Sequence, residues 1–134
     1  MGLSDEIAVG GLYEGPPVAS EDVVSVYVVL NGTLGMSPGK TAAQTFHCGW
    51  LLARTQPWFD HIEGQWMNQG RRVVVRVAET EHVFHRVMSE CAGVAQRDEG
   101  LQEVERGSIT AFVTVPYRRA EVPKILTHKK VQLL

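Results

Sequence analysis

Apolar runs of strand length alternate along this chain with longer segments whose apolar positions recur at helical spacing. The clearest run extends from Val23 to Leu30 and is β-branched at most of its positions. A nearly continuous apolar run of this length is typical of a strand that is buried on both faces of a sheet. The pattern therefore predicts a central strand here, with the folded domain beginning near Glu21.

A helix is predicted after the glycine-rich turn of residues 31–37. Ser37 is suited to cap it and Pro38 to occupy its first position, because the amide hydrogen that proline lacks is not needed there. The helix should run to about Arg54. Its spacing predicts a buried face formed by Ala42, Ala43, Phe46, Trp50 and Ala53. A second face carries Lys40, Gln44, His47 and Leu51, so three polar side chains line up along the first two turns.

The remaining segments continue the alternation of strands and helices. Strands are predicted at residues 71–77, 94–97 and 109–115, a helix at residues 80–91, a last helix at residues 118–128 and an edge strand at residues 131–134. Pro123 would have to lie in the first turn of that last helix. Residues 55–69 contain Pro57, Gly64 and three large aromatic residues, and we expect them to be helical only in part. This order of elements indicates a layered α/β domain.

The helix of residues 80–91 has a distinct apolar face. Its inward positions are predicted to be Val83, Phe84, Val87, Met88 and Cys91, and Gly93 should end it. Cys91 and Cys48 both lie in apolar helical patterns, which predicts buried reduced thiols rather than a disulfide. A catalytic cysteine is the lesser alternative.

One domain, residues 21–134, is expected, because 134 residues with 44% apolar content can form one core but not two. Residues 1–20 mix glycine, proline and acidic residues without periodicity, which predicts a flexible N-terminal arm. No apolar run is long enough to cross a membrane, and the first residues lack the character of a signal peptide. A soluble cytoplasmic protein with no membrane contact is therefore expected.

Charge is distributed unevenly although the formal net charge is only −2. Residues 1–22 hold five acids and no base, whereas the segment from residue 106 onward holds six bases and one acid, Glu121. The six are Arg106, Arg118, Arg119, Lys124, Lys129 and Lys130. This segment either contacts nucleic-acid phosphates or is an ordinary solvated surface, and the sequence leaves both alternatives open.

The segment Gly39-Lys40-Thr41 invites comparison with a phosphate-binding loop. That motif requires a glycine at position 34, which is Leu34, so the spacing excludes a nucleotide triphosphatase of this type. A lysine in the first turn of a helix, beside exposed amides, still suits an anionic group. His47 on the same face is able to transfer protons near neutral pH, although a lone helical histidine is more often structural or exposed.

Further candidate side chains follow the third and precede the fourth predicted strand. Asp98 lies in the turn Asp98-Glu99-Gly100, and Ser108 and Thr110 offer hydroxyl groups near the start of residues 109–115. No G-x-S-x-G nucleophile elbow is present, which argues against a Ser-His-Asp hydrolase. His82 and His85 lack further ligands at suitable spacing, so no zinc site is expected.

The order of these residues is similar to that of a known family. The segments that match are Val26 to Leu30, Leu34-Gly35-Met36, Gly39 to His47, Arg72 to Arg76, Asp98-Glu99-Gly100, Gly107-Ser108 with Thr110, Pro116 and Leu133-Leu134. Together they resemble the type II peptidyl-tRNA hydrolases of archaea and eukaryotes. The combination of Met, Gly-Lys, Ala-Ala-Gln and His is the specific part of this resemblance.

The resemblance implies a three-layer α/β/α domain with a mixed four-stranded sheet, often assembled as a homodimer. It also implies cleavage of the ester that joins a peptide to tRNA, without cofactor or metal. By this resemblance Lys40 would meet a tRNA phosphate or the ester, Gln44 and His47 would line the same cleft, and Asp98 would orient or activate water. Lys40 and the hydroxyls of Ser108 and Thr110 are then the candidate donors to the developing oxyanion.

The chain departs from the family pattern beside the expected aspartate. The family usually reads Asp-Ala-Gly-x-Thr, whereas this chain reads Asp98-Glu99-Gly100-Leu101-Gln102. We expect a second carboxylate at this turn either to disfavour the charged form of the first or to repel RNA. The alternative interpretation is a divergent protein of the same fold that binds RNA or protein, or that acts on another substrate.

Overall fold

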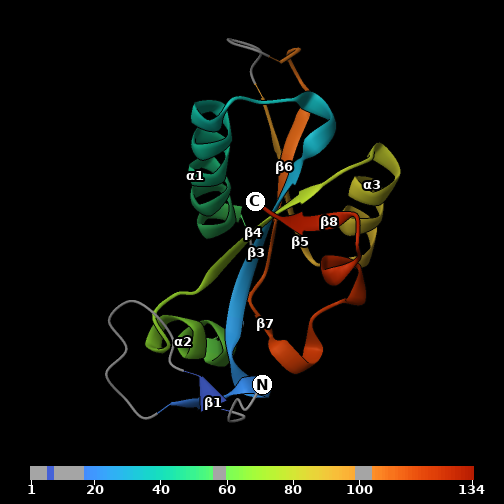
Figure 1. Cartoon of the computed structure of the whole chain (residues 1–134). Coiled ribbons are helices and arrows are strands. Elements are labelled where there is room, and N and C mark those ends of the chain that lie inside the picture. Colours follow the sequence, from blue (N-terminus) through green and yellow to red (C-terminus); the bar gives the residue numbers. More distant parts are fainter. Residues whose placement is uncertain (1–5, 8–16, 56–59, 99–103) are drawn as a thin grey trace.

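The computed structural model describes residues 6–7, 17–55, 60–98 and 104–134 and shows a mixed sheet with helices on both faces (Figure 1). Helix α1 (Pro38–Thr55) and helix α2 (Asp60–Asn68) lie on one side of the sheet, and helix α3 (Glu81–Glu90) lies on the other. The three-layer α/β/α arrangement implied by the family resemblance is confirmed. Among the described residues, no helix has both the length and the apolar character needed to cross a bilayer.

The sheet contains six strands in the described part of the chain, so the expected number of four was wrong. The strands are β3 (Val24–Asn31), β4 (Val73–Ala78), β5 (Gly93–Arg97), β6 (Ile109–Thr114), β7 (Tyr117–Arg118) and β8 (Val131–Leu133). Their order is β5-β6-β3-β4-β8, and β7 pairs with the start of β3 beyond β6. Strands β3 and β4 are parallel and every other pair in this sheet is antiparallel. The added strands are the short β7 and the edge strand β8, the latter predicted at residues 131–134.

Strand β3 is the central strand, as its apolar run predicted, and all eight of its residues are buried. Its side chains alternate between two cores because successive residues of a strand point to opposite faces. One core gathers Val26, Val28 and Leu30 with Cys48, Leu52, Ala111 and Val113 under α1 and α2. The other gathers Tyr27 and Val29 with Val83, Phe84, Val87, Cys91, Phe112, Ile125, Leu126 and Val131 under α3.

Helix α1 has the predicted limits, but the face that it buries against the sheet differs from the predicted one. Ser37 caps it by accepting a hydrogen bond from the backbone N–H of Lys40 at 3.2 Å, and Pro38 is its first residue. The prediction that Ala42, Ala43, Phe46, Trp50 and Ala53 form the buried face is wrong. All five are exposed, Phe46 by 74% and Trp50 by 62%, and the buried residues are Gln44, Cys48 and Leu52. Alanine gives little orientational preference, and partners of Gln44 far away in the sequence fix the face.

Helix α3 agrees with the sequence pattern. Thr80 caps it by accepting a hydrogen bond from the N–H of Val83 at 3.2 Å, and Val83, Phe84, Val87 and Cys91 are buried. Strand β5 then begins at Gly93, where a Cβ atom would lie 2.1 Å from the carbonyl oxygen of Val113. Only glycine permits this close approach of β5 to β6 without a shift of backbone.

The last predicted helix is not formed. Residues 118–128 instead contain two 3-10 helices, Arg119–Glu121 and Lys124–Thr127. Pro123 lies between them with extended backbone, and it offers no amide hydrogen to carry a helix across this point. Ile125 and Leu126 of the second turn are buried against α3 and β8, so short turns suffice to cover this part of the core.

The described chain before β3 forms a short strand pairing and a 3-10 turn that the sequence did not predict. Strand β1 (Glu6–Ile7) pairs antiparallel with β2 (Val18–Ala19), and a 3-10 turn follows at Ser20–Asp22. The rest of residues 1–16 lies outside the described residues, so the flexible arm stays a prediction. Trp58 and Phe59 also lie outside the described residues. Trp66 of α2 packs onto the core that contains Val26, Val28 and Leu30.

The buried face of α1 can be tested by truncation. Leu52→Ala should lower the free energy of unfolding by about 2–5 kcal/mol, because it leaves a cavity in the core. Phe46→Ala should change it by about 0.5 kcal/mol or less, because that side chain is exposed. Urea unfolding followed by circular dichroism measures both. If Phe46→Ala lowers the free energy of unfolding more than Leu52→Ala does, the buried face is the one that the sequence predicted.

Candidate active site

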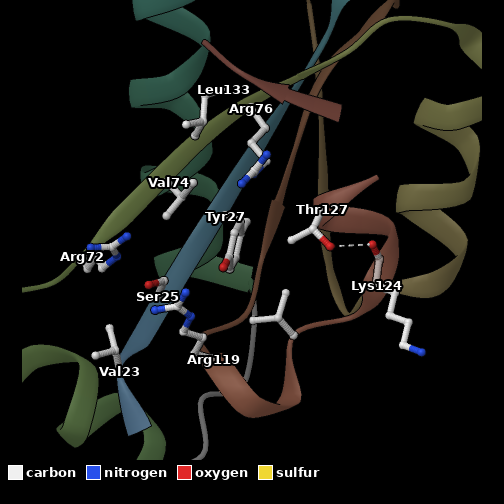
Figure 2. A pocket seen from close by; sticks show the side chains of 11 residues that line it. Val23, Ser25, Tyr27, Arg72, Val74, Arg76, Arg119, Lys124, Thr127 and Leu133 are labelled. Atoms are coloured by element: carbon white, nitrogen blue, oxygen red, sulfur yellow. Dashed lines mark hydrogen bonds between the residues drawn. The ribbon is translucent and has the colours of Figure 1, made fainter. Parts of the chain in front are cut away.

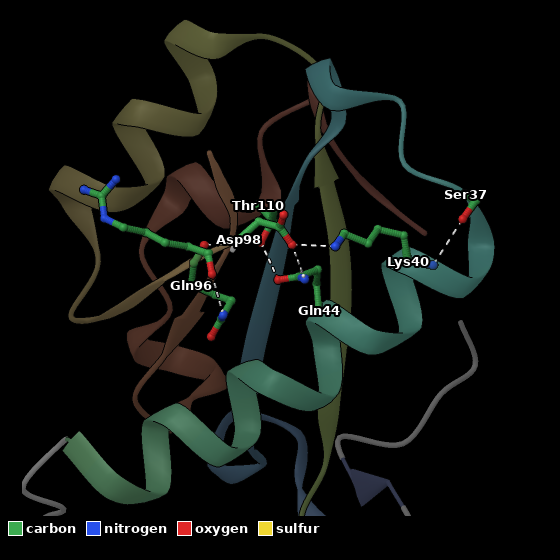
Figure 3. A network of polar contacts seen from close by, with 7 residues as sticks. Ser37, Lys40, Gln44, Gln96, Asp98 and Thr110 are labelled. Carbon is green, nitrogen blue, oxygen red and sulfur yellow. Dashed lines mark hydrogen bonds and ion pairs between the residues drawn. The ribbon is translucent and has the colours of Figure 1, made fainter. Parts of the chain in front are cut away.

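Four polar side chains from three separate segments meet at the first two turns of α1 (Figure 3). Lys40 and Gln44 come from α1, Asp98 directly follows β5, and Thr110 lies in β6. Because α1 lies across β5 and β6, its inward residues face the end of one strand and the start of the other. The sequence proposed all four residues as site residues, and the structure brings them together.

A buried ion pair lies at the centre of this group. The Lys40 Nζ atom lies 2.5 Å from Asp98 Oδ1, and the two side chains are only 12% and 5% exposed. A charge withdrawn from water in this way requires a charged or hydrogen-bonding partner. The pair therefore ties the start of α1 to the end of β5.

Gln44 links the ion pair to Thr110. Its Nε2 group donates to Asp98 Oδ1 at 3.2 Å, and its Oε1 atom accepts from the Thr110 hydroxyl at 2.6 Å. Since the hydroxyl donates to the carbonyl end of the amide, the amino end is turned toward the carboxylate. Both side chains are buried, at 2% for Gln44 and 0% for Thr110, so water does not compete for these bonds.

The main chain around Asp98 is held by the segment that precedes β6. The N–H of Asp98 donates to the carbonyl of Ser108 at 2.9 Å, and the N–H of Gly107 donates to the carbonyl of Asp98 at 2.8 Å. Gly107 adopts a φ of +85°, a conformation that favours glycine. These contacts fix the carboxylate relative to Thr110.

The two other predicted site residues are placed differently. His47 is exposed on α1, and in the part of the chain that the structure describes no polar contact joins it to the four residues; its ring lies edge-on to that of Phe46, with centroids 6.4 Å apart. Ser108 is half-buried and contributes through its backbone carbonyl. Gln96 was missed: its carbonyl lies 3.2 Å from the Thr110 hydroxyl oxygen and is the more distant of two acceptors for the one hydroxyl hydrogen, the nearer being Gln44 Oε1. A backbone acceptor leaves no signal in the sequence.

An apolar hollow of about 510 Å³ opens beside the first turns of α1. It is lined by Met36, Pro38, Thr41, Ala42, Thr45, Val75 and Leu134. Thr41 and Thr45 follow Lys40 and Gln44 in α1, so the hollow and the polar group both involve the first two turns of this helix. These turns carry a cation and an amide toward Asp98 and line an apolar hollow with other residues.

Neither cysteine has the properties of a nucleophile. Both are free and buried, as predicted. Burial raises the pKa of Cys48 to about 12, and burial together with the charge of Glu90 raises that of Cys91 to about 11. Both thiols are therefore protonated near neutral pH, which argues against the alternative of a catalytic cysteine.

The histidines of α3 do not form part of a recognisable metal site. Within the described ranges, no group of three or more His, Cys, Asp or Glu side chains is placed to hold a metal ion. His85 lies 3.2 Å from Glu81 in an exposed helical pair. The site as described rests on Lys40, Gln44, Asp98 and Thr110.

The layered fold and its polar site define an α/β protein whose site is built around a buried lysine–aspartate pair. The family model described as peptidyl-tRNA hydrolase PTH2 matches residues 24–132, which includes the main sheet up to Gln132 in β8 and all four residues of the polar group. The chain belongs to the peptidyl-tRNA hydrolase PTH2 family.

Individual relatives agree with this assignment. The chain is 30% identical to the peptidyl-tRNA hydrolase of Methanococcus maripaludis over 112 residues, which cover 78% of this chain and 95% of that protein. It is 29% identical to that of Methanocaldococcus jannaschii over 118 residues, or 81% and 99% of the two chains. For Methanopyrus kandleri the identity is 28% over 104 residues, covering 73% and 89%.

The protonated state of the thiols has a measurable consequence. A raised pKa lowers the thiolate fraction at any given pH, so at pH 8 both cysteines should react with a thiol reagent more slowly than in the unfolded chain, by roughly two to three orders of magnitude. Reaction kinetics with and without denaturant provide the comparison. Rapid modification of Cys48 in the folded protein would reopen the case for a nucleophilic cysteine.

Proposed function

We propose that this protein hydrolyses the ester bond by which a peptide is attached to tRNA. The observation that carries this proposal is the buried Lys40–Asp98 pair with Gln44, in a chain of the peptidyl-tRNA hydrolase PTH2 family. Ester hydrolysis requires an activated water molecule and a stabilising charge for the developing oxyanion. A carboxylate and an ammonium group beside one another can supply both.

Lys40 is proposed to stabilise negative charge. Its ammonium lies in the first turn of α1, where the positive end of the helix dipole adds to its field. It is largely shielded from water, and electrostatic interactions are stronger in such surroundings. The ester carbonyl oxygen, which becomes negatively charged in the tetrahedral intermediate, is the proposed acceptor.

Asp98 is proposed to orient or activate the attacking water. Its carboxylate is held from three directions: by Lys40, by Gln44 and by the backbone contacts to Ser108 and Gly107. A base with so few conformations available needs little reorganisation when substrate arrives. Deprotonation of water by the carboxylate would give hydroxide for attack on the ester carbonyl. The protonated carboxyl group of Asp98 then returns this proton to the tRNA 3′ oxygen, which leaves as the alcohol when its bond to the carbonyl carbon breaks.

Gln44 and Thr110 are proposed to set the geometry of this carboxylate. Thr110 is completely buried, so its hydroxyl acts through Gln44 rather than on the substrate. The apolar hollow beside Thr41 and Thr45 is the proposed place for the first side chain of the peptide. Participation of His47 and of the Ser108 hydroxyl stays a prediction of the family resemblance, as do the homodimer and the cytoplasmic location.

The altered turn leaves the described part of the site in place. Glu99 to Gln102, where the chain departs from the usual family pattern, lie outside the described residues. Asp98 nevertheless forms its contacts with Lys40 and Gln44. The structure therefore favours the hydrolase over the divergent alternative.

Removal of either charge should abolish most of the activity. Lys40→Ala and Asp98→Asn should each lower kcat/KM for peptidyl-tRNA by about 10²–10⁴-fold, the range expected for loss of a charge-stabilising or proton-transferring group. Peptide release from a peptidyl-tRNA substrate measures this loss.

The matched control is Lys129→Ala, which also removes one lysine but from an exposed position remote from α1 in the sequence. It should retain the parent rate, and thermal unfolding should show that all variants are folded. Absence of peptide release by the folded parent protein in excess would reject the proposed function.

The positioning role of Thr110 predicts a selective effect. Thr110→Val should lower kcat about tenfold or more with little change in KM, because the amide of Gln44 loses the donor that orients it. Thr110→Ser keeps the hydroxyl and should recover most of kcat. If valine and serine lower kcat equally, Thr110 is a packing residue only.

A further inference from the structure

Another hollow, lined in part by polar residues, lies on the face of the sheet opposite to α1 (Figure 2). Its volume is about 380 Å³, and it is bounded by the first half of β3, by β4 and β8, and by the two 3-10 turns near the C-terminus. Four basic residues, Arg72, Arg76, Arg119 and Lys124, line it, and none of its described lining residues is acidic. In a chain with a net charge of −2, this is a marked local excess of positive charge.

Strand register explains how the basic residues reach this hollow. Arg72, Val74 and Arg76 are alternate residues and therefore point to one face of the sheet. Val74 pairs with Tyr27, and Arg76 pairs with Val29. Arg119 comes from a different segment, and its N–H donates to the carbonyl of Val23 at 2.8 Å, which fixes its 3-10 turn against the start of β3. Distant parts of the sequence thus contribute to one basic wall.

The basic groups are not neutralised by the protein. Within the described ranges, none of the four forms an ion pair. Arg76 donates from Nη1 to the carbonyl of Val131 at 3.0 Å, but its Nε atom is shielded from solvent and has no partner among the described residues. Arg119 donates from Nη1 to the Ser20 hydroxyl at 2.9 Å. A guanidinium group has five donor hydrogens, so both side chains retain donors for a ligand.

The orientation of the side chains distinguishes direct ligands from the rim. Figure 2 shows the guanidinium groups of Arg76 and Arg119 on either side of Tyr27, with that of Arg119 near Ser25, whereas the ammonium of Lys124 points away from these residues. Arg72 and Arg76 are separated by roughly 13 Å along the strand, so an anion that meets the whole wall must carry more than one charged group. Arginine is suited to phosphate because its donors match the oxygen geometry.

We propose that this hollow binds a ligand with two or more phosphate groups, with Arg76 and Arg119 as its direct ligands and Arg72 at the rim. The hydroxyl groups of Ser25 and Tyr27 lie between the two arginines and offer further donors. Two sources share this chemistry: consecutive phosphates of an RNA strand, and a free phosphorylated small molecule. The site is distinct from the Lys40–Asp98 group and does not depend on ester hydrolysis.

Calorimetric titration with inorganic pyrophosphate at low salt tests the site. The parent should bind, and Arg76→Gln and Arg119→Gln should each weaken binding at least tenfold. Arg86→Gln is the matched control, since it removes the same charge from an exposed pair with Glu90 on α3 and should change affinity less than twofold. The side chain of Arg119 is exposed, so Arg119→Gln retains the test if Arg76→Gln fails to fold.

Titration with a single-stranded RNA oligonucleotide identifies the source of the phosphates. Weaker RNA binding by both variants would assign the site to RNA. The slope of the logarithm of the binding constant against the logarithm of salt concentration should then decrease by about one for each variant. Unchanged RNA binding with loss of pyrophosphate binding would assign it to a small molecule. The proposal is overturned if the folded parent binds pyrophosphate no more tightly than the two variants and RNA binding is unaffected, or if Arg86→Gln weakens binding equally. Neither titration involves hydrolysis, so failure of the proposed function would leave this result interpretable.

Discussion

The buried ion pair between Lys40 and Asp98 is the constraint on which the arrangement of the site depends. Removing one partner of a buried pair typically costs about 3–5 kcal/mol, because the other charge remains without compensation. Here the two partners belong to segments 58 residues apart, the start of α1 and the end of β5. The ammonium and the carboxylate therefore fix how α1 lies on the sheet, and in the proposed reaction they are also the reacting groups. The stability of the fold and the proposed reaction therefore both require a lysine at position 40 and an aspartate at position 98.

The same pair explains why α1 presents an unusual face to the sheet. Its buried side begins with the polar Gln44 and becomes apolar only at Cys48 and Leu52, while Phe46 and Trp50 remain exposed. Burial of Gln44 is tolerated because both ends of its amide have partners, in Asp98 and Thr110. A fully satisfied polar network of this kind rigidifies the site, whereas loss of one member leaves another group buried without a partner.

The physical basis of each sequence prediction explains which ones succeeded. Strand β3 was predictable because both of its faces are buried, which requires a continuous apolar run. The cap at Ser37 was predictable because capping depends on neighbouring residues alone. The buried face of α1 was not, because large apolar side chains normally indicate a core and the partners of Gln44 lie 54 and 66 residues away. Candidate site residues fared better through resemblance: spacing placed Lys40, Gln44 and His47 on one face of the helix, but it could not show that only the first two turn toward Asp98.

Alternation along the sheet determines how the two polar regions of this molecule relate. In β4, Val75 and Val77 pack on the α1 side, whereas Val74, Arg76 and the preceding Arg72 line the hollow on the other side. The Lys40–Asp98 group and the arginine wall are thus separated by a layer of backbone and by the apolar side chains of β3. Such a layer has little room for polar rearrangement, and it separates a ligand in the hollow from the ion pair. Its influence on the reaction would have to come from holding one molecule that reaches around the sheet edge, which a long RNA can do and a small phosphate compound cannot.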